Sequence, residues 1–318
     1  MSTPARYLVT GGAGFIGSSL ARALLDAGER VRVLDDFSTG HRRNLEGLSA
    51  ACASRLEIVE GSVVDEGAVA RAMKGVEIVF HKAAVASVPR SVERPLETDA
   101  INTRGTLVVL EAARAAGAKR VIYAGSSAAY GNDPRLPKRE DMTPEPLSPY
   151  AVSKLAGEHY LSAYAIVHGL ETVTLRYFNV FGPRQDPNGA YAAVIPRWCH
   201  AALSGEPIVI HGDGGQTRDF GHIDNIVHAN LLAGSTKQRL AGEVVNVSCG
   251  ERISLLQLAD AIEALTGRPL PRSFEAARAG DVRDSVADIS RARSLLGYEP
   301  RVFWRDGLAR TIEALRAR

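Results

Sequence analysis

The chain has 318 residues, and its 38 basic and 36 acidic side chains leave a formal net charge of only +2. Such a balance gives no field that would attract nucleic acid or a membrane surface, so we expect a small-molecule partner and neither of those. Three cysteines lie far apart without metal-ligand spacing, which predicts buried free thiols and no metal site. Because we find no signal peptide and no run of about 18 apolar residues, we expect a cytoplasmic protein.

Short β-branched runs alternate with segments of helical period from the start of the chain to Tyr177. The predicted strands are 6–10, 30–35, 56–61, 76–81, 120–126 and 172–177, and the predicted helices are 15–27, 66–74, 97–117 and 150–168. The strands are hydrophobic along almost their whole length, which is typical of parallel strands covered on both faces. The alternation therefore predicts an α/β fold with a doubly wound parallel sheet.

The alternation breaks down beyond about residue 180. Segments 181–189 and 212–219 are rich in Gly, Pro, Asp and Asn, the residues of turns and ligand-binding loops. One more strand is expected at 243–248, with helices near 254–266 and 304–316. We predict a Rossmann domain over residues 1–180, with a later contribution from about 222–250. Residues 181–318 would mainly form a smaller α/β substrate-binding domain.

A glycine-rich turn joins the first predicted strand to the first helix. Gly11, Gly14 and Gly17 follow one another at three-residue intervals. Glycines in this context allow a tight turn and let the backbone approach a pyrophosphate at the helix N-terminus. The second predicted strand ends at Asp35, where a carboxylate can bind both hydroxyls of an adenosine ribose. The two features together predict a dinucleotide site.

The residue after Asp35 bears on the choice of cofactor. Asp36 would repel the 2′-phosphate of NADP, so the sequence favours NAD. Arg42 and Arg43 lie close enough in the sequence to leave NADP as an alternative.

The stretch "SPYAVSK" (148–154) places a tyrosine and a lysine one helical turn apart. Ser148 is a good N-cap and Pro149 suits the first helical position, so Tyr150 and Lys154 should share one face of a helix N-terminus. A phenol is a weak base at neutral pH because its pKa is near 10. A neighbouring ammonium, the helix N-terminus and a cationic nicotinamide all favour the phenolate, so we expect Tyr150 to act as a general base.

The chain resembles the extended short-chain dehydrogenase/reductases, and within them the nucleotide-sugar 4-epimerases. The motifs that carry the resemblance are "TGGAGFIG" (10–17), "HKAA" (81–84), "AGSSAAYG" (124–131), "SPYAVSK" and "LRYFNVFGPRQ" (175–185). They span essentially the whole chain. Bacterial UDP-N-acetylglucosamine 4-epimerases are the most similar group, through "ASVPRS" (86–91) and "RQDPNGAYAAVIPRW" (184–198).

This resemblance implies a catalytic set of Ser126, Tyr150 and Lys154. Tyr150 would be the base, Lys154 would bind the nicotinamide ribose, and Ser126 would hold the reacting hydroxyl, a role that Ser127 could share. The implied reaction oxidises carbon 4 of a UDP-sugar by hydride transfer to NAD, rotates the 4-keto sugar and reduces its other face. Because no net redox change occurs, NAD should stay bound through each cycle.

The resemblance also implies a set of cofactor contacts, most of them in the first domain. They are Gly11, Gly14, Phe15, Ile16, Gly17, Asp35, Asp36, Ser62, Val63, His81, Ala83, Ala84, Asn102, Tyr150, Lys154 and Tyr177. Ser62 departs from the pattern, because many relatives carry an aspartate there that binds adenine. Asp65, three residues on, is a candidate to compensate.

The implied substrate contacts are Ser87, Ser126, Ser127, Asn179, Ala193, Val194, Arg197, Arg218, Arg278, Asp281 and Ser285. Arg218 and Arg278 would bind the diphosphate, since a planar guanidinium suits phosphate oxygens. Asp281 would bind the uridine ribose. Ser285 occupies a pocket-wall position where a small side chain leaves room for a 2-N-acetyl group. This favours UDP-GlcNAc and UDP-GalNAc as substrates, with UDP-Glc and UDP-Gal also accepted, because a roomy pocket rejects smaller substrates weakly.

Three alternatives remain beside this interpretation. A dehydratase or decarboxylase would need an acid directly after Ser126, where this chain has Ser127 and Ala128. A UDP-glucuronate/galacturonate 4-epimerase stands second, because Arg184 could receive a sugar carboxylate. A non-catalytic NAD-binding protein is opposed by the complete Ser126, Tyr150 and Lys154 set.

The helices expected at 97–117 and 150–168 carry the apolar residues Leu107, Leu110, Leu161 and Val167. In the family that the chain resembles, the equivalent helices form an intersubunit four-helix bundle. We therefore expect a homodimer with two-fold symmetry.

Overall fold

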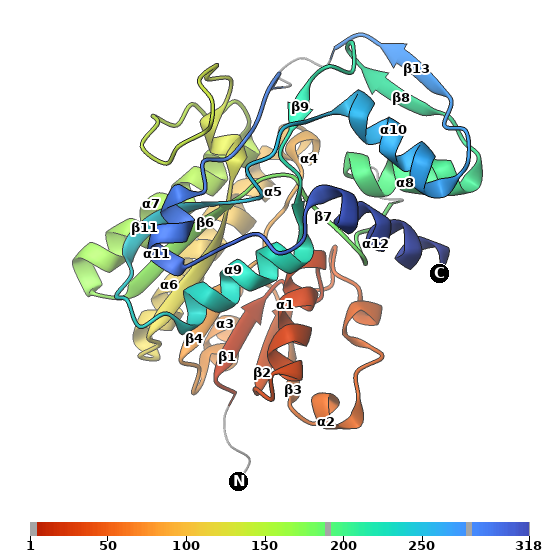
Figure 1. Cartoon of the computed structure of the whole chain (residues 1–318). Helices are drawn as coiled ribbons and strands as arrows, with labels where there is room; N and C mark the ends of the chain where they lie inside the picture. The colour runs from red at the N-terminus through yellow and green to blue at the C-terminus, as the bar shows by residue number, and fades with distance from the viewer. Residues whose placement is uncertain (1–4, 188–191, 278–281, 318) are drawn as a thin grey trace.

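A seven-stranded parallel sheet forms the centre of the computed structural model, which describes residues 5–187, 192–277 and 282–317 (Figure 1). The strand order is β11-β6-β5-β4-β1-β2-β3. The strands are β1 (Tyr7–Thr10), β2 (Val31–Asp35), β3 (Leu56–Glu60), β4 (Ile78–His81), β5 (Arg120–Ser126), β6 (Glu171–Tyr177) and β11 (Ala241–Val247). The order reverses between β1 and β4, and a ligand of such a sheet binds at the carboxyl ends of the strands beside this switch point.

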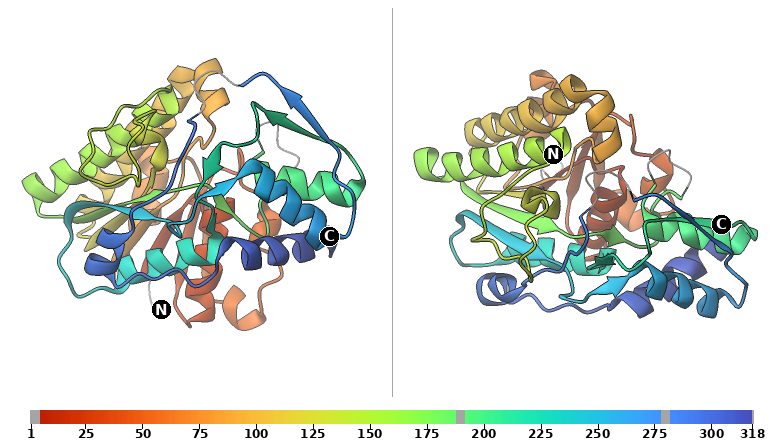
Figure 2. Two further views of the ribbon diagram at one scale, coloured as in Figure 1. Left: turned by 45° about the horizontal axis from the view of Figure 1, so that its top comes forward. Right: turned by 90° about the horizontal axis from the view of Figure 1, so that it is seen from above.

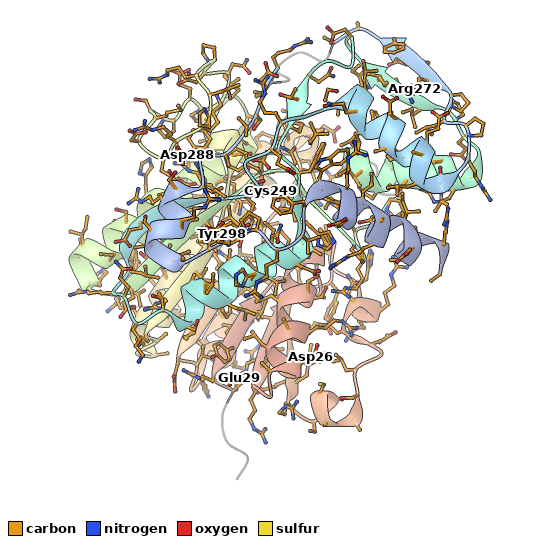
Figure 3. All side chains as sticks on the ribbon, in the orientation of Figure 1. Asp26, Glu29, Cys249, Arg272, Asp288 and Tyr298 are labelled. Carbon is orange, nitrogen blue, oxygen red and sulfur yellow. The ribbon has the colours of Figure 1, made fainter. Side chains whose placement is uncertain are left out.

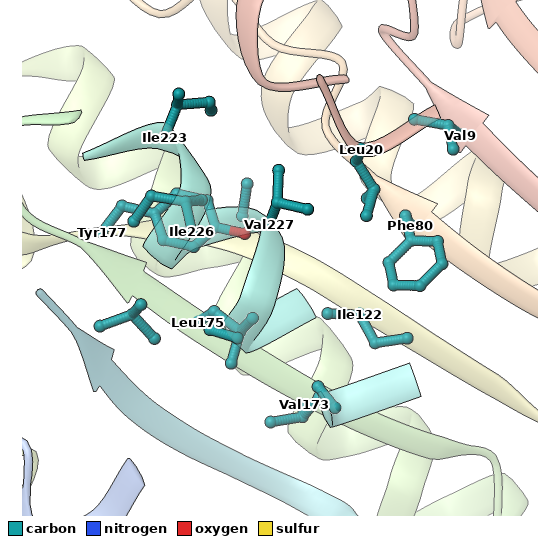
Figure 4. Packing of buried hydrophobic residues seen from close by; sticks show 14 of the residues in the cluster. Val9, Leu20, Phe80, Ile122, Val173, Leu175, Tyr177, Ile223, Ile226 and Val227 are labelled. Atoms are coloured by element: carbon teal, nitrogen blue, oxygen red, sulfur yellow. The ribbon is translucent and has the colours of Figure 1, made fainter. Parts of the chain in front are cut away.

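Helices cover both faces of the sheet, which confirms the predicted doubly wound fold. One face carries α1 (Phe15–Asp26), α9 (Ile223–Ser235) and α11 (Ser290–Leu296), and the other carries α3 (Glu66–Met73), α6 (Gly105–Ala115) and α7 (Pro149–His168). Figure 4 shows part of the first face, where Leu20 of α1 and Ile226 of α9 pack with Phe80 and Ile122 of the sheet. Burial of such apolar side chains is the main favourable term in folding.

The segment after α11 is tied back to the sheet by a buried phenol. The hydroxyl of Tyr298 donates to the carbonyl oxygen of Ser248, 2.9 Å away, directly after β11. Cys249 follows Ser248 and lies close to Tyr298 in Figure 3. All three cysteines, Cys52, Cys199 and Cys249, are buried and free.

A third core lies beside the sheet and holds the C-terminal elements together. It buries residues of α8 (Val194–Ser204), β8 (Ile208–His211), α10 (Leu255–Thr266) and α12 (Trp304–Arg316), with β13 (Arg272–Glu275) paired in parallel to β8. Both views of Figure 2 place these elements on one side of the main sheet. The chain also forms two pairs of two-residue strands between β6 and α10. They are β7 (Val180–Phe181) with β10 (Gly221–His222), and β9 (Thr217–Arg218) with β12 (Ile253–Ser254).

Every predicted strand is present to within two residues, and so is every predicted helix except 97–117. That segment is α5 (Pro95–Asp99), then a π-helical turn over Ala100–Arg104, then α6. π-helical turns inside helices are frequent at functional sites. The sequence did not predict α2 (Ala50–Ala53), α4 (Val88–Glu93), the 3-10 helices Arg42–Leu45 and Ser127–Tyr130, or the elements α8, α9, α11, β8 and β13.

Among the described residues, no helix has both the length and the apolar character needed to cross a membrane. The same part of the chain contains no cluster of three His, Cys, Asp or Glu side chains that could hold a metal ion.

Candidate active site

The first turn of α7 carries the predicted tyrosine and lysine. Ser148 is the N-cap, since its Oγ accepts from the backbone N–H of Ala151 at 3.2 Å, and Pro149 begins the helix. Lys154 is buried one turn after Tyr150, and its Nζ lies 4.5 Å from the centre of the Tyr123 ring. The N-cap and the geometry of one helical turn thus place both side chains as predicted.

Ser126 ends β5 and begins the 3-10 helix Ser127–Tyr130. Its Oγ accepts from the N–H of Ala128 at 3.2 Å, and its side chain is near enough to Tyr150 to lower the pKa of that phenol. A cavity of about 880 Å³ opens over this group. The predicted site residues that line it are Gly14, Phe15, Ile16, Gly17, Ala84, Ser126, Ser127, Tyr150, Lys154, Tyr177, Asn179, Ala193, Arg218 and Ser285.

Burial shifts the pKa values of both α7 groups in the unfavourable direction. It raises the pKa of Tyr150 above 10, and the hydrogen bond from Ser126 opposes the rise. It lowers the pKa of Lys154 from 10.5 to about 7, against the attraction of Glu158. Burial of the phenol thus opposes the phenolate in the protein alone. The cationic nicotinamide of bound NAD would act in the opposite direction, so the role of Tyr150 as a base stays a prediction.

The turn between β1 and α1 is packed too closely for any side chain at two of its glycines. A Cβ on Gly17 would lie 2.1 Å from the carbonyl oxygen of Gly11. Gly11 has a φ of +64°, and a Cβ there would lie 2.7 Å from the backbone of Ala83. The bare backbone leaves the N-terminus of α1 open toward the cavities. This is the cradle that a pyrophosphate requires, so the turn fits NAD.

A second cavity, of about 90 Å³, lies on the β2 side of this turn. The predicted cofactor residues that line it are Gly11, Gly14, Asp35, Asp36, Ser62, Val63, Ala83 and Ala84. The carboxylate of Asp35 is held in place because Oδ2 accepts from Ala13 N–H and Oδ1 from Phe37 N–H, both at 2.8 Å. Each oxygen keeps a lone pair for a ribose hydroxyl, so this cavity fits an adenosine.

Two predicted cofactor residues line none of the cavities described. His81 is buried between the hydroxyls of Thr10 and Thr106, 2.7 and 3.0 Å from its ring nitrogens. Asn102 lies in the π-helical turn, accepts from Val85 N–H at 2.8 Å and donates to Ser153 Oγ at 2.9 Å. His81 therefore joins β4 to β1 and α6, and Asn102 joins the segment after β4 to α7. Their contacts with the cofactor stay predictions.

The predicted substrate residues are divided between two adjoining cavities. Val194 and Arg197 line a third cavity of about 290 Å³, which shares Asn179, Ala193 and Arg218 with the catalytic one. Arg278 and Asp281 lie outside the described residues.

Ser87 and Ser285 were both expected at the sugar. Ser285 is buried, donates its N–H to Thr217 at 3.1 Å, and lines the catalytic cavity. Ser87 instead caps α4, where its Oγ accepts from Arg90 N–H at 3.2 Å, and it does not line the cavity. Its neighbours Val88 and Pro89 do. The contact of Ser87 with the sugar stays a prediction. The sequence pattern does not predict α4, although Ser-Val-Pro is a typical helix start that could indicate it.

Several lining residues were not assigned a role from the sequence. Lys82 lines the first two cavities and Lys138 the catalytic one, together with Thr39, Gln185, Val92 and Leu147. They come from loops and from α4, whose positions depend on tertiary packing rather than on local sequence.

The parallel sheet, the glycine turn with Asp35, and the serine, tyrosine and lysine around one cavity together define a dinucleotide-dependent α/β enzyme that works on a hydroxyl or carbonyl group. Residues 7–248 match the model of the NAD dependent epimerase/dehydratase family, and the chain belongs to this family. The resemblance found in the sequence and the choice of NAD as cofactor are both confirmed.

Relatives of known name align over almost the whole chain. A UDP-glucose 4-epimerase of Mycolicibacterium smegmatis is 41% identical over 315 residues, 98% of each chain. The crystal structure of a UDP-glucose 4-epimerase from Thermotoga maritima with UDP-glucose is similar at a TM-score of 0.92 and 38% identity, covering 98% of each chain. A UDP-N-acetylglucosamine 4-epimerase from Methanobrevibacter ruminantium M1 in complex with UDP-N-acetylmuramic acid has a TM-score of 0.92 and 36% identity, covering 99% of each chain.

Proposed function

We propose that this protein is an NAD-dependent UDP-sugar 4-epimerase, an isomerase whose preferred pair is UDP-GlcNAc and UDP-GalNAc. The observation that carries the proposal is the meeting of Ser126, Tyr150 and Lys154 in one cavity. That cavity shares Gly14 and Ala84 with the glycine-turn cavity. The named relatives support the epimerase class.

The cofactor would be held by the glycine turn, by Asp35 at its adenosine, and by Lys154 at its nicotinamide ribose. When bound, NAD would supply the hydride chemistry: it would accept a hydride, one proton with two electrons, from carbon 4 of the sugar and return it to the opposite face. Ser126 would hold the hydroxyl of carbon 4 by a hydrogen bond. Tyr150 would take the proton of that hydroxyl during oxidation and give it back during reduction, so no proton need leave the cavity.

The uridine diphosphate would be bound by the C-terminal elements, where Arg218 borders both the catalytic and the third cavity. The arginine suits phosphate oxygens. Such an anchor would hold the nucleotide while the 4-keto sugar turns in a cavity of about 880 Å³. This assigns residues 1–180, with about 222–250, to the cofactor and most of 181–318 to the substrate.

The N-acetyl preference rests on Ser285. Its side chain is small and buried at the wall of the catalytic cavity, and Val282 lines the cavity three residues earlier. The similar UDP-N-acetylglucosamine 4-epimerase supports this choice. The UDP-glucose 4-epimerases among the relatives support plain UDP-hexoses as second substrates.

The uronate alternative rests on Arg184, which was expected to receive a sugar carboxylate. Its Nη2 donates to Ser19 Oγ of α1 at 2.9 Å, and Arg184 is not among the residues that line the catalytic cavity. Arg184 therefore does not supply a positive charge to bind the carboxylate of a uronic acid in this cavity. We expect UDP-GlcA to be a poor substrate.

One panel tests the proposal. UDP-Glc, UDP-GlcNAc and UDP-GlcA are each incubated without added reductant, and the 4-epimer is measured by chromatography. The Tyr150→Phe variant should lose activity by about 10²–10⁴-fold, the usual contribution of a positioned general base. If no UDP-sugar is converted, the epimerase assignment is wrong.

The Ser285→Tyr variant tests the pocket wall in the same panel. A tyrosine should fill the space for the 2-N-acetyl group, so UDP-GlcNAc turnover should fall by about tenfold or more while UDP-Glc turnover is largely kept. The matched control is Ser290→Tyr, at the exposed start of α11. If Ser285→Tyr converts UDP-GlcNAc at the wild-type rate, residue 285 does not form the wall of the pocket for the 2-N-acetyl group.

A further inference from the structure

A buried carboxylate lies directly after β9 and joins it to two other segments of the chain. Asp219 is fully buried. Its Oδ1 accepts from Ser248 Oγ at 2.6 Å and from the N–H of Cys249 at 3.2 Å. Its Oδ2 accepts from the N–H groups of Gly250 and Ala287 at 2.9 and 3.0 Å. Burial raises the pKa of this carboxyl group, and the four hydrogen bonds oppose the rise.

Three of the predicted substrate residues are connected to Asp219. Arg218 precedes it in the chain. The Nδ2 of Asn179 donates to the carbonyl oxygen of Asp219 at 3.3 Å. Ser285 lies two residues before Ala287, whose N–H the carboxylate binds. Arg218, Asn179 and Ser285 all line the catalytic cavity, whereas Asp219 lines none of the three cavities described.

The segment 285–288, which we call the pocket wall, is bound on two sides. On one side the N–H of Ser285 donates to the carbonyl oxygen of Thr217 at 3.1 Å, and that of Ala287 to Asp219. On the other side Lys138 donates its N–H to the carbonyl oxygen of residue 286 at 2.8 Å and accepts from the N–H of residue 288 at 2.9 Å. Asp219 is thus a fully buried side chain that holds the pocket wall against β9.

We propose that Asp219 is a positioning residue that holds the pocket wall at Ser285 at a fixed distance from Arg218, the predicted diphosphate contact. The inference rests on the proposed function in one respect, the placing of the diphosphate at Arg218 and of the sugar at Ser285. A pocket wall that moved relative to Arg218 would change the space for the sugar while the nucleotide stayed bound. Binding of the sugar would therefore depend on a side chain outside the cavity.

Binding measurements test this without turnover of the sugar. The NAD-loaded full-length Tyr150→Phe variant serves as the parent, and calorimetry gives its Kd for UDP and for UDP-GlcNAc. Adding Ala287→Pro removes the N–H that Asp219 binds, and proline suits the position because this N–H takes no part in the pairing with Lys138. The ratio of the Kd for UDP-GlcNAc to the Kd for UDP should rise about tenfold, as expected for a change in one pocket contact.

The matched control is Ser248→Ala in the same parent. It also removes one hydrogen bond to the carboxylate of Asp219, but from Oδ1 and from the segment after β11. Both substitutions should lower the temperature of thermal unfolding, and only Ala287→Pro should change the ratio of the two Kd values. Asp219→Ala should raise the ratio as well. The double variant Asp219→Ala/Ala287→Pro should not exceed Asp219→Ala, because the same contact is lost.

The outcomes are distinct. Ratios equal to that of the parent in Ala287→Pro and Asp219→Ala would overturn the inference, and so would a tenfold rise in Ser248→Ala. Asp219→Asn, which keeps one acceptor oxygen, replaces either variant that does not fold, and an unchanged ratio in it has the same meaning. A parent that binds no UDP would overturn the inference together with the proposed function. A wild-type protein that epimerises no UDP-sugar, with the tenfold rise present in Ala287→Pro, would refute the proposed function and leave the role of Asp219 standing.

Discussion

Burial lowers the pKa of Lys154 from 10.5 to about 7, so this side chain is hard to charge in the place where its charge is needed. The unfolded chain binds the proton up to about pH 10.5, and the folded protein releases it near pH 7. The free energy of unfolding should therefore fall as the pH is lowered from about 10.5 to 7, and this contribution is constant below that. At neutral pH the buried ammonium destabilises the fold.

The Lys154→Met variant should accordingly be more stable than wild type at pH 7. We expect a gain on the order of 2 kcal/mol, less than the full pKa shift implies because the cation also loses its contact with the Tyr123 ring. The gain should shrink toward pH 10. Urea unfolding at both pH values, at equal NAD occupancy, measures it, with the exposed Lys119→Met as control. A variant less stable than wild type at pH 7 would contradict the prediction.

Among single residues, the sequence predicts the relative positions of those that lie close together in the chain. Tyr150 and Lys154 are one helical turn apart, and Ser148 and Pro149 start the helix, so their geometry follows from spacing alone. Lys82 could not be assigned a role in the same way. Its contacts with Ile122 and Tyr177 join strands that are distant in the chain, and only the strand order of the folded sheet brings them together.

Helix α7 is anchored to the sheet by a buried ion pair. Glu158 of α7 and Arg176 of β6 are each 3% exposed and share three hydrogen bonds of 2.7 to 3.1 Å. The guanidinium also lies 4.7 Å from the centre of the Tyr130 ring, at the end of the 3-10 helix that follows Ser126. This pair therefore fixes the helix that carries Tyr150 relative to the turn that carries Ser126.

The Glu158→Gln variant should lower the free energy of unfolding by about 3 kcal/mol, since it leaves the buried guanidinium without its countercharge. Urea unfolding measures the loss. A matched surface change, Glu299→Gln, breaks an exposed ion pair with Arg293 and should alter stability by less than about 1 kcal/mol. Equal effects of the two substitutions would show that burial does not matter here. The double variant Glu158→Gln/Arg176→Met should recover part of the loss.

The elements that were not predicted share a physical reason. Strands β7, β9, β10 and β12 have two residues each, too few for any hydrophobic period. Strand β8 pairs with β13 although α9, β11 and α10 lie between them in the chain, a contact that no local pattern encodes. The six strands expected before Phe178 were found because burial on both faces makes each a continuous apolar run.

At the scale of the whole molecule, the three hydrophobic cores explain why the site residues come from two separately packed parts of the chain. The first two cores hold the faces of the main sheet, whose carboxyl edge supplies Ser126, Lys82 and the glycine turn. The third core holds α8, α10 and α12, beside which Arg218 lies. A cavity between separately packed groups of elements is a common place for a ligand.

The predicted dimer surface needs correction in two of its residues. Leu110 and Leu161 are buried in the second core of the monomer, so they cannot contact a partner. Val167 is 71% exposed and Ile166 77% exposed. Ile166 continues a line of exposed α7 positions that starts at Val152 and follows a seven-residue repeat through 159 and 163, as in helices that pack against another helix. We propose that this face of α7 forms a two-fold dimer interface.

The Ile166→Glu variant tests that interface. A carboxylate at this end of the exposed line would have to be buried against the partner's copy of α7 without a countercharge. We expect a dimeric mass for wild type and a monomeric mass for the variant by light scattering after size-exclusion chromatography. The control, Phe274→Glu, changes an exposed residue of β13 far from α7 and should leave the mass unchanged. Since α7 also carries Tyr150, bound NAD should be measured in both variants. A monomeric wild type would refute the dimer, whereas an Ile166→Glu variant that keeps its NAD and remains dimeric would place the interface on another face.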